Sequence, residues 1–292
     1  MTLKIKRLSE CTFEEAVKAW NAGFEGYYFD ATTTVDNFVK RLVGEGLSPK
    51  LSIVAFQGHE PIGIVKNGVR LFNKTKIAWN GGTGVASAYR GKGIGKALME
   101  TTLAIYQEEG VELATLEAIS DNQKAISLYE KMGYEIVDDL EYLELKGAQP
   151  NPFGSIQEYI VEQTIPQEVS FLPFYKGQNP WQTQWQSAKD GEALIVKDEH
   201  GFDIGYAYYR RVFNVNGKHE RTILFQCEAH PERKDAEGII RFLLSRVFGS
   251  FGDDVVRVVP NVPVNHSPLT YSLLKQIGFQ PIVNQVWMMK QM

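Results

Sequence analysis

The chain is poor in the residues that cross-link a fold, bind metals or span a membrane. It holds two cysteines, Cys11 and Cys227, in 292 residues, which excludes a disulfide framework. No apolar run approaches membrane-spanning length, and the N terminus lacks the apolar core of a secretion signal. No metal-ligand spacing joins the five histidines, His59, His200, His219, His230 and His266. We therefore expect a cytoplasmic protein with free thiols, no metal and no membrane partner.

The chain also lacks an excess of positive charge. Its net charge is -4 and its isoelectric point is near 5.8, which argues against a nucleic-acid partner. Its hydrophobic content of 43% is that of a packed globular protein, and 292 residues suffice for two domains.

The most informative segment is the glycine-rich turn Arg90-Gly91-Lys92-Gly93-Ile94-Gly95. It opens directly into an apolar-periodic helix, predicted from Ile94 to Glu109. Such a turn presents backbone N–H groups and the positive end of the helix dipole to an anion, and a glycine lets a pyrophosphate come close. The alternative to an anion site is an ordinary tight turn at a helix start.

Spacing excludes two well-known phosphate loops. The nucleoside-triphosphate loop needs a glycine five positions before its Gly-Lys pair and a hydroxyl after it, where this chain has Arg90 and Ala97. The dinucleotide fingerprint needs a third small residue, where this chain has Lys96. What remains is Arg-x-x-Gly-x-Gly after an extended segment that ends at Thr83-Gly84-Val85.

A second cluster lies one strand downstream. Its matching residues are Asn122, Ala125, Leu128, Tyr129, Gly133 and Tyr134. The pair of clusters resembles the GNAT superfamily of N-acetyltransferases, whose signature joins Arg-x-x-Gly-x-Gly to Asn-x-x-Ala-x-x-Leu-Tyr and Gly-aromatic. The close resemblance covers residues 85–134, and a looser one covers residues 1–148.

The resemblance implies that acetyl-CoA binds as the acetyl donor. The loop amides would hold its pyrophosphate, the end of the preceding strand would pair with its pantetheine arm, and the Val85 N–H would polarise the thioester carbonyl. Asn122 would contact the coenzyme, or only cap its own helix. The implied coenzyme-binding residues are Thr83, Gly84, Val85, Arg90, Gly91, Lys92, Gly93, Ile94, Gly95, Lys96 and Asn122.

Two residues are catalytic candidates. Tyr129 lies on the inward face of a predicted helix over residues 123–132, where its phenol would protonate the departing thiolate. Otherwise it is a core tyrosine. Glu117, on the strand before the second motif, stands where some members of the superfamily carry a general base, and otherwise it only forms a salt bridge.

The acceptor site is less clearly marked. In the superfamily the segment between the first two helices lines it, which is Trp20 to Asp30 here. Its aromatic rings and two acids suit a cationic amine, with Phe24, Tyr27 and Tyr28 as candidate substrate-binding residues. The alternative is an aromatic cluster that packs between domains.

The chain is predicted to be an α/β protein of two tandem GNAT-like domains, each a mixed, mostly antiparallel sheet flanked by helices. A linker-like stretch near residues 146–155 places the catalytic domain at 1–148 and a second domain at 149–292. An offset of 144 or 145 maps Gly133-Tyr134 onto Gly278-Phe279. The same offset replaces the loop glycines by Glu237 and Ile239, so the second domain is predicted to be degenerate and unable to bind a coenzyme.

The resulting hypothesis is an N-acetyltransferase in which a primary amine attacks acetyl-CoA directly. The acceptor is a small molecule or a peptide amine, and the oligomeric state is open. The alternative is a noncatalytic acyl-CoA-binding or regulatory protein.

Overall fold

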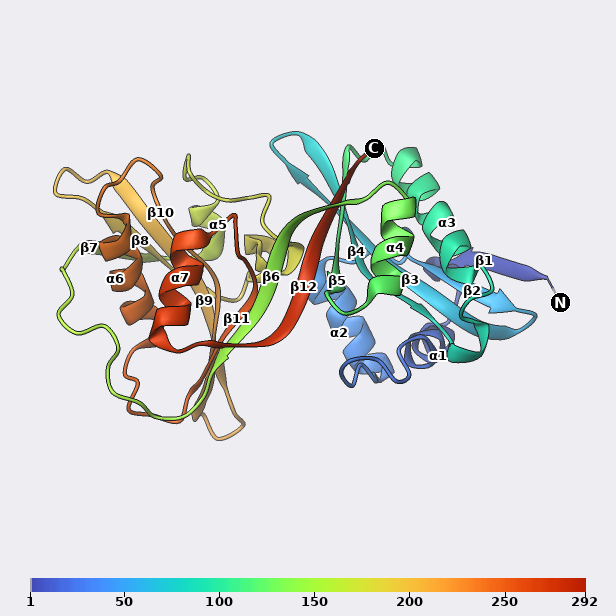
Figure 1. The fold of residues 1–292 in the computed structure, drawn as a ribbon, viewed down its shortest axis with the longest axis horizontal. Coiled ribbons are helices and arrows are strands. Elements are labelled where there is room, and N and C mark those ends of the chain that lie inside the picture. Colours follow the sequence, from blue (N-terminus) through green and yellow to red (C-terminus); the bar gives the residue numbers. More distant parts are fainter. Residues whose placement is uncertain (1) are drawn as a thin grey trace. The chain divides into compact units, whose positions relative to one another are not determined.

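The computed structural model describes residues 2–292 (Figure 1). By its internal contacts the chain divides into two compact units: unit 1, Met1–Val137 with Val286–Met292, and unit 2, Asp138–Gln285. The division lies about ten residues before the one expected at 148/149, and the last residues of the chain group with unit 1. The reason is that two long strands, β6 (Glu135–Leu145) and β12 (Gln280–Gln291), run across the division instead of ending at it.

Unit 1 contains four helices and five strands that lie wholly within it. In chain order they are β1 (Leu3–Arg7), α1 (Phe13–Gly23), α2 (Val35–Glu45), β2 (Ile53–Gln57), β3 (Glu60–Phe72), β4 (Thr75–Val85), α3 (Ile94–Glu108), β5 (Leu113–Ile119) and α4 (Gln123–Lys131). The strand order is β1-β2-β3-β4-β5. Neighbouring strands are antiparallel except β4 and β5, which are parallel.

Local sequence explains where the first two helices begin and end. The Thr12 side chain accepts a hydrogen bond from the Glu15 amide while the Glu15 carboxylate accepts one from the Thr12 amide, which forms a capping box at the start of α1. The Thr34 hydroxyl caps α2. Helix α2 ends at Gly46, which caps it in the left-handed conformation with a φ of 66°.

Helices cover both faces of the unit 1 sheet. Met99 and Tyr106 of α3 pack with Tyr129 of α4 against Ala78 and Leu116 of the sheet. On the opposite face α1 packs very closely on β4, where a Cβ added to Gly84 would lie 2.8 Å from the Phe24 ring.

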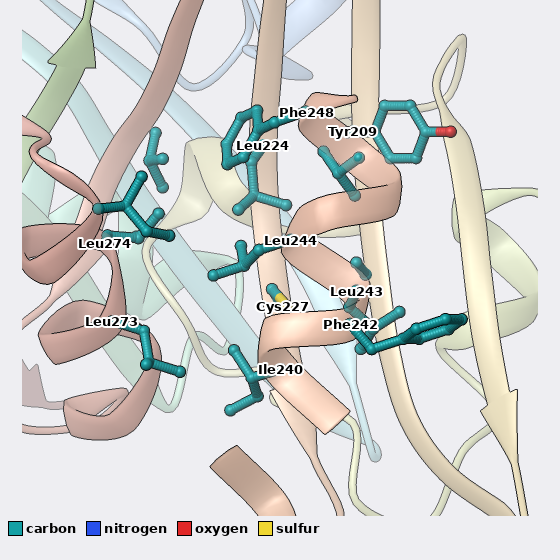
Figure 2. Packing of buried hydrophobic residues seen from close by; sticks show 14 of the residues in the cluster. Tyr209, Leu224, Cys227, Ile240, Phe242, Leu243, Leu244, Phe248, Leu273 and Leu274 are labelled. Atoms are coloured by element: carbon teal, nitrogen blue, oxygen red, sulfur yellow. The ribbon is translucent and has the colours of Figure 1, made fainter. Parts of the chain in front are cut away.

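Unit 2 repeats most of the order of unit 1, with the four-residue helix α5 and two 3-10 turns in place of α1 and α2. Its elements are β7 (Ile160–Thr164), α5 (Pro166–Val169), β8 (Glu192–Lys197), β9 (Asp203–Phe213), β10 (His219–Ala229), α6 (Ala236–Phe248), β11 (Val256–Pro263) and α7 (Pro268–Ile277). Its strands follow in the order β11-β10-β9-β8-β7. Figure 2 shows its core, in which Leu244 of α6 and Leu274 of α7 pack with Leu224 of β10.

The predicted α/β class of two like-ordered halves is confirmed. Trp181 and Trp185, four residues apart, each begin a separate three-residue 3-10 turn. No helix of residues 2–292 has the length and apolar composition needed to cross a bilayer.

Candidate active site

The centre of the candidate site is a fork between β4 and β5. The two strands pair from Ile77↔Leu113 to Asn80↔Leu116. Beyond that point β4 runs on to Val85 and β5 runs on to Ile119, so their facing edges lie open. An extended ligand with hydrogen-bonding groups fits such an opening as an additional strand.

The backbone of β4 directs two N–H groups into this fork. The Ala86 amide donates to the Ile62 carbonyl of β3. Antiparallel pairs alternate between bonded and non-bonded positions, so Val85 and Thr83 occupy non-bonded positions opposite Gly63 and Val65. Their N–H groups therefore point away from β3 and into the fork, as expected for Thr83 and Val85.

Helix α3 begins beside the end of β4 with free backbone donors. Gly91 and Gly93 have φ values of 75° and 81°, and Gly93 is the N-cap residue. No atom of the described chain lies within 4 Å of a Cβ added at either glycine, so here backbone conformation, not crowding, favours glycine. No side chain of residues 2–292 caps this helix. The amides of Ile94, Gly95 and Lys96 are thus available to an anion.

Two other residues of the glycine-rich turn, Gly95 and Arg90, have structural roles. A Cβ on Gly95 would lie 3.3 Å from the Leu128 side chain, so this glycine lets α3 and α4 pack closely. The Arg90 guanidinium donates to the carbonyl oxygens of Val85, Gly23 and Glu25 at 2.8, 3.0 and 3.2 Å. Arg90 therefore ties the end of α1 to the end of β4, a role that the sequence did not indicate.

The structure brings four of the predicted residues together around the fork. Tyr129 is 7% exposed and forms a hydrogen bond with Thr83. Burial raises the pKa of Tyr129 to about 12, and the bond from Thr83 only partly offsets this rise. Burial also raises the pKa of the Tyr27 phenol, opposed by a hydrogen bond with the Asn122 side chain. Tyr129 therefore remains a neutral proton donor at ordinary pH.

Asn122 caps its own helix, which is one of the two roles weighed for it. Its side chain accepts a hydrogen bond from the Ala125 amide at 3.3 Å and is the N-cap of α4. It also reaches Tyr27, which places it at the fork.

Glu117 lies one residue beyond the last position at which β5 pairs with β4, and its side chain is on the face of the sheet opposite Tyr129. Its neighbours Leu116 and Ala118 pack with Tyr129, and side chains alternate along a strand. Its carboxylate accepts a hydrogen bond from the Trp79 indole N–H at 2.6 Å. The structure thus fixes Glu117 at the fork, on the face covered by α1 and α2.

Trp20 and the aromatic residues that follow α1 form a cluster in which each ring contacts the next. Trp20 stacks on Phe24 at 4.1 Å, and Phe24 meets Tyr27 edge-on at 5.1 Å. Tyr28 and Phe29 both contact the Tyr27 ring at 5.2 Å between centroids. Phe24 and Tyr27 lie against the fork, whereas Tyr28 is 54% exposed and lies outside it.

Lys66 is the residue at this site that the sequence analysis missed. It lies on β3 and is 1% exposed, with its ammonium 3.5 Å from the centre of the Trp20 ring. The register of β3 and β4 shifts between Val65↔Thr83 and Asn67↔Asn80, so Lys66 faces the two-residue bulge Gly81–Gly82. The sequence feature that could have indicated Lys66 is a lysine within an otherwise apolar strand.

Unit 2 has an equivalent fork, but side chains fill it. Strands β10 and β11 pair only from Arg221↔Val256 to Ile223↔Val258. Beyond this the Thr270 hydroxyl donates to the Cys227 carbonyl, and the Ser267 hydroxyl donates to Glu228, both at 2.5 Å. The cavity left between them has a volume of about 10 Å³, room for no more than one water.

The helix start in unit 2 is also occupied. Asp235 is the N-cap of α6, and its carboxylate accepts two bonds from the Arg233 guanidinium at 2.8 and 2.9 Å. Glu237 adds a second acid in the first turn. The Asp235 carboxylate makes no capping bond to the helix amides, but two acidic side chains at this helix start disfavour the approach of an anion.

An open strand fork beside a glycine-capped helix with free amides offers backbone hydrogen-bond donors to an extended ligand that carries an anionic group. Comparison with known proteins identifies the class more narrowly. Residues 9–134 match the model of the Acetyltransferase (GNAT) family. The first half of the chain is thus similar to an acetyltransferase (GNAT) domain.

A mycothiol acetyltransferase of Propionibacterium freudenreichii is 30% identical over 106 residues. That match covers 33% of this chain and 32% of the relative, so it spans about a third of either protein.

Solved structures extend the likeness to the whole chain. A tandem GNAT protein from the clavulanic acid biosynthesis pathway covers 99% of this chain and 98% of its own, with a TM-score of 0.63 and 13% identity. A GCN5-related N-acetyltransferase from Sphaerobacter thermophilus covers 99% and 95%, with a TM-score of 0.64 and 14% identity. At these identities the likeness shows the fold, and that fold is the tandem GNAT fold.

Proposed function

We propose that unit 1 transfers an acetyl group from acetyl-CoA to a primary amine. The observation that carries the proposal is the fork itself, with inward N–H groups on Thr83 and Val85 next to the uncapped start of α3. The amides of Ile94, Gly95 and Lys96 suit a pyrophosphate, and the fork suits the extended arm of the coenzyme. Acetyl-CoA supplies the activated thioester.

The protein groups divide the work of the reaction. The lone pair of the amine attacks the thioester carbonyl carbon, and the Val85 N–H stabilises the negative charge that develops on the carbonyl oxygen. As the carbon–sulfur bond breaks, the Tyr129 phenol gives its proton to the departing sulfur. The proton that the amine loses passes to Glu117, directly or through water. These roles follow from the side each residue occupies: Tyr129 on the α4 face and Glu117 on the opposite face.

The proposal is tested by release of free coenzyme A thiol from acetyl-CoA in the presence of a library of primary amines. We expect amine-dependent release from the wild-type protein. Acetyl-CoA that stabilises the protein in a thermal shift without any amine-dependent release indicates the noncatalytic acyl-CoA-binding alternative instead. Failure of acetyl-CoA to stabilise the protein at millimolar concentration contradicts both.

The Glu117→Gln variant tests the path of the amine proton. Glutamine keeps an oxygen that accepts the Trp79 indole N–H, so the local structure stays in place. We expect the rate to lose the acidic limb of its pH profile, since glutamine has no titrating group. A variant that keeps the wild-type acidic limb removes Glu117 from the mechanism.

A further inference from the structure

A cavity of about 290 Å³ opens between the aromatic segment and α2, on the face that holds Glu117. Its polar and aromatic walls include Trp20, Asp30, Asn37, Phe38, Arg41 and Lys66. The volume is enough for a small organic molecule of amino-acid size.

The floor of the cavity is a buried cation without a counter-ion. Lys66 is 1% exposed, and its nearest partners are the rings of Trp20 at 3.5 Å and Phe38 at 5.4 Å. Among residues 2–292, no carboxylate forms a salt bridge with it. A buried ammonium is costly unless it is paired, so an anion bound beside Lys66 would favour its charged form.

The other charges around the cavity limit that anion to a single charge. The Arg41 Nε is 2.8 Å from the Glu45 carboxylate, which neutralises most of its charge, and Arg41 also donates to the Gly81 carbonyl. Asp30 adds a negative charge at the exposed edge. One uncompensated cation with an acid nearby suits a carboxylate and would repel a doubly charged phosphate.

One wall residue of the cavity, Lys66, faces the strand that leads into the fork. Lys66 faces the Gly81–Gly82 bulge of β4, and a Cβ on Gly82 would lie 2.8 Å from the Trp20 ring. Thr83, the next residue, directs its N–H into the fork. The bulge therefore separates the cation from the fork by one strand position.

These positions also change the expected recognition of the acceptor. The Trp20 ring was expected to attract a cationic amine. Lys66 already occupies one face of that ring and Phe24 stacks with it as well.

We propose that the acceptor is an amine that also carries a carboxylate, and that this carboxylate binds Lys66 in the cavity while the amine reaches the fork. The inference rests on the proposed acetyl transfer and adds the class of its acceptor. Lys66 is then a specificity-determining residue, not a catalytic one.

The test compares the twenty amino acids with their C-terminal amides, and β-alanine with phosphoethanolamine, as acceptors in the thiol-release assay. The wild-type protein is compared with Lys66→Met, Lys66→Arg and the control Lys40→Met, which removes an exposed lysine from α2. A charge-assisted bond to a carboxylate predicts that Lys66→Met raises KM for the acid by about tenfold or more, and changes KM for the amide less than about twofold. Lys66→Arg and Lys40→Met should keep the preference for the acid.

Three results overturn the inference alone: equal use of acid and amide by the wild-type protein, an equal effect of Lys66→Met on both, or a preference for phosphoethanolamine. The control for folding is stabilisation of Lys66→Met by acetyl-CoA. If no amine releases thiol, the transfer proposal fails. Calorimetric titration of the same amino acids into wild type and Lys66→Met then decides the cavity separately, because binding that depends on Lys66 supports it and binding that is absent or unchanged refutes it.

Discussion

At the scale of single residues, the site combines a neutral phenol on one face of the sheet with two charged groups on the other. Tyr129 is buried and bonded to Thr83, whereas Glu117 and Lys66 lie towards α1 and α2. This separation suits a reaction in which the leaving group and the attacking amine need opposite proton transfers.

Tyr129→Phe removes the proton donor and keeps the ring. We expect kcat to fall by about 10²-fold, the usual worth of a general acid, with little change in acetyl-CoA affinity. The raised pKa of about 12 means that wild-type activity has no alkaline limb from this phenol below pH 11. Steady-state kinetics across pH check both statements. Unchanged turnover refutes the acid role.

Lys66→Met should stabilise the free protein. Burial, with a smaller contribution from Arg41, holds the pKa of Lys66 well below its usual value, opposed by Glu45. Below its native pKa this lysine carries its full penalty. Between that pKa and the unfolded value of about 10.4 the unfolded chain binds more protons, so wild-type stability rises with pH.

Urea unfolding at several pH values measures this effect. The expected gain of Lys66→Met is about 1–3 kcal/mol near pH 7, and it should shrink as the pH approaches 10. A variant that is less stable than wild type at pH 7 contradicts the description of Lys66 as an uncompensated charge.

At the scale of elements, the starts of α1 and α3 depend on residues that are close together in the chain, so the sequence alone indicates them. The glycines at 91 and 93 set the start of α3 through their own φ angles, and Thr12 with Glu15 sets the start of α1. Features that depend on distant pairing were missed. The bulge opposite Lys66 requires the register of β3 on β4, and β12 requires partners far away in the chain.

The α3 start is tested by Gly93→Ala, with Gly110→Ala at the other end of the same helix as its control. Both glycines have a positive φ, 81° and 66°, and neither has an atom close enough to clash with a Cβ. Each change should therefore cost about 1 kcal/mol of stability through backbone strain alone. Only Gly93→Ala should weaken acetyl-CoA binding in a calorimetric titration. Equal affinities in both variants exclude this turn from the coenzyme site.

At the scale of the whole chain, the two units have a similar order of helices and strands but differ in what lies in their strand forks. In unit 1 the fork is open and the helix start bears glycines. In unit 2 Thr270 and Ser267 donate hydrogen bonds to Cys227 and Glu228 of β10, and Asp235 lies at the helix start. The loss of the loop was predictable by offset from Glu237 and Ile239. The filled fork was not, because its hydroxyls come from Ser267 and Thr270, at the start of a helix that follows β11, and they meet β10 only in the folded chain. The division into domains 1–148 and 149–292 stays a prediction.

A crystal structure with acetyl-CoA tests the central claim most directly. We predict one coenzyme per chain, with its diphosphate on the amides of residues 94–96 and its arm along Thr83 to Val85. A coenzyme seated against residues 234–239 of unit 2, or none bound at saturating concentration, would contradict the account.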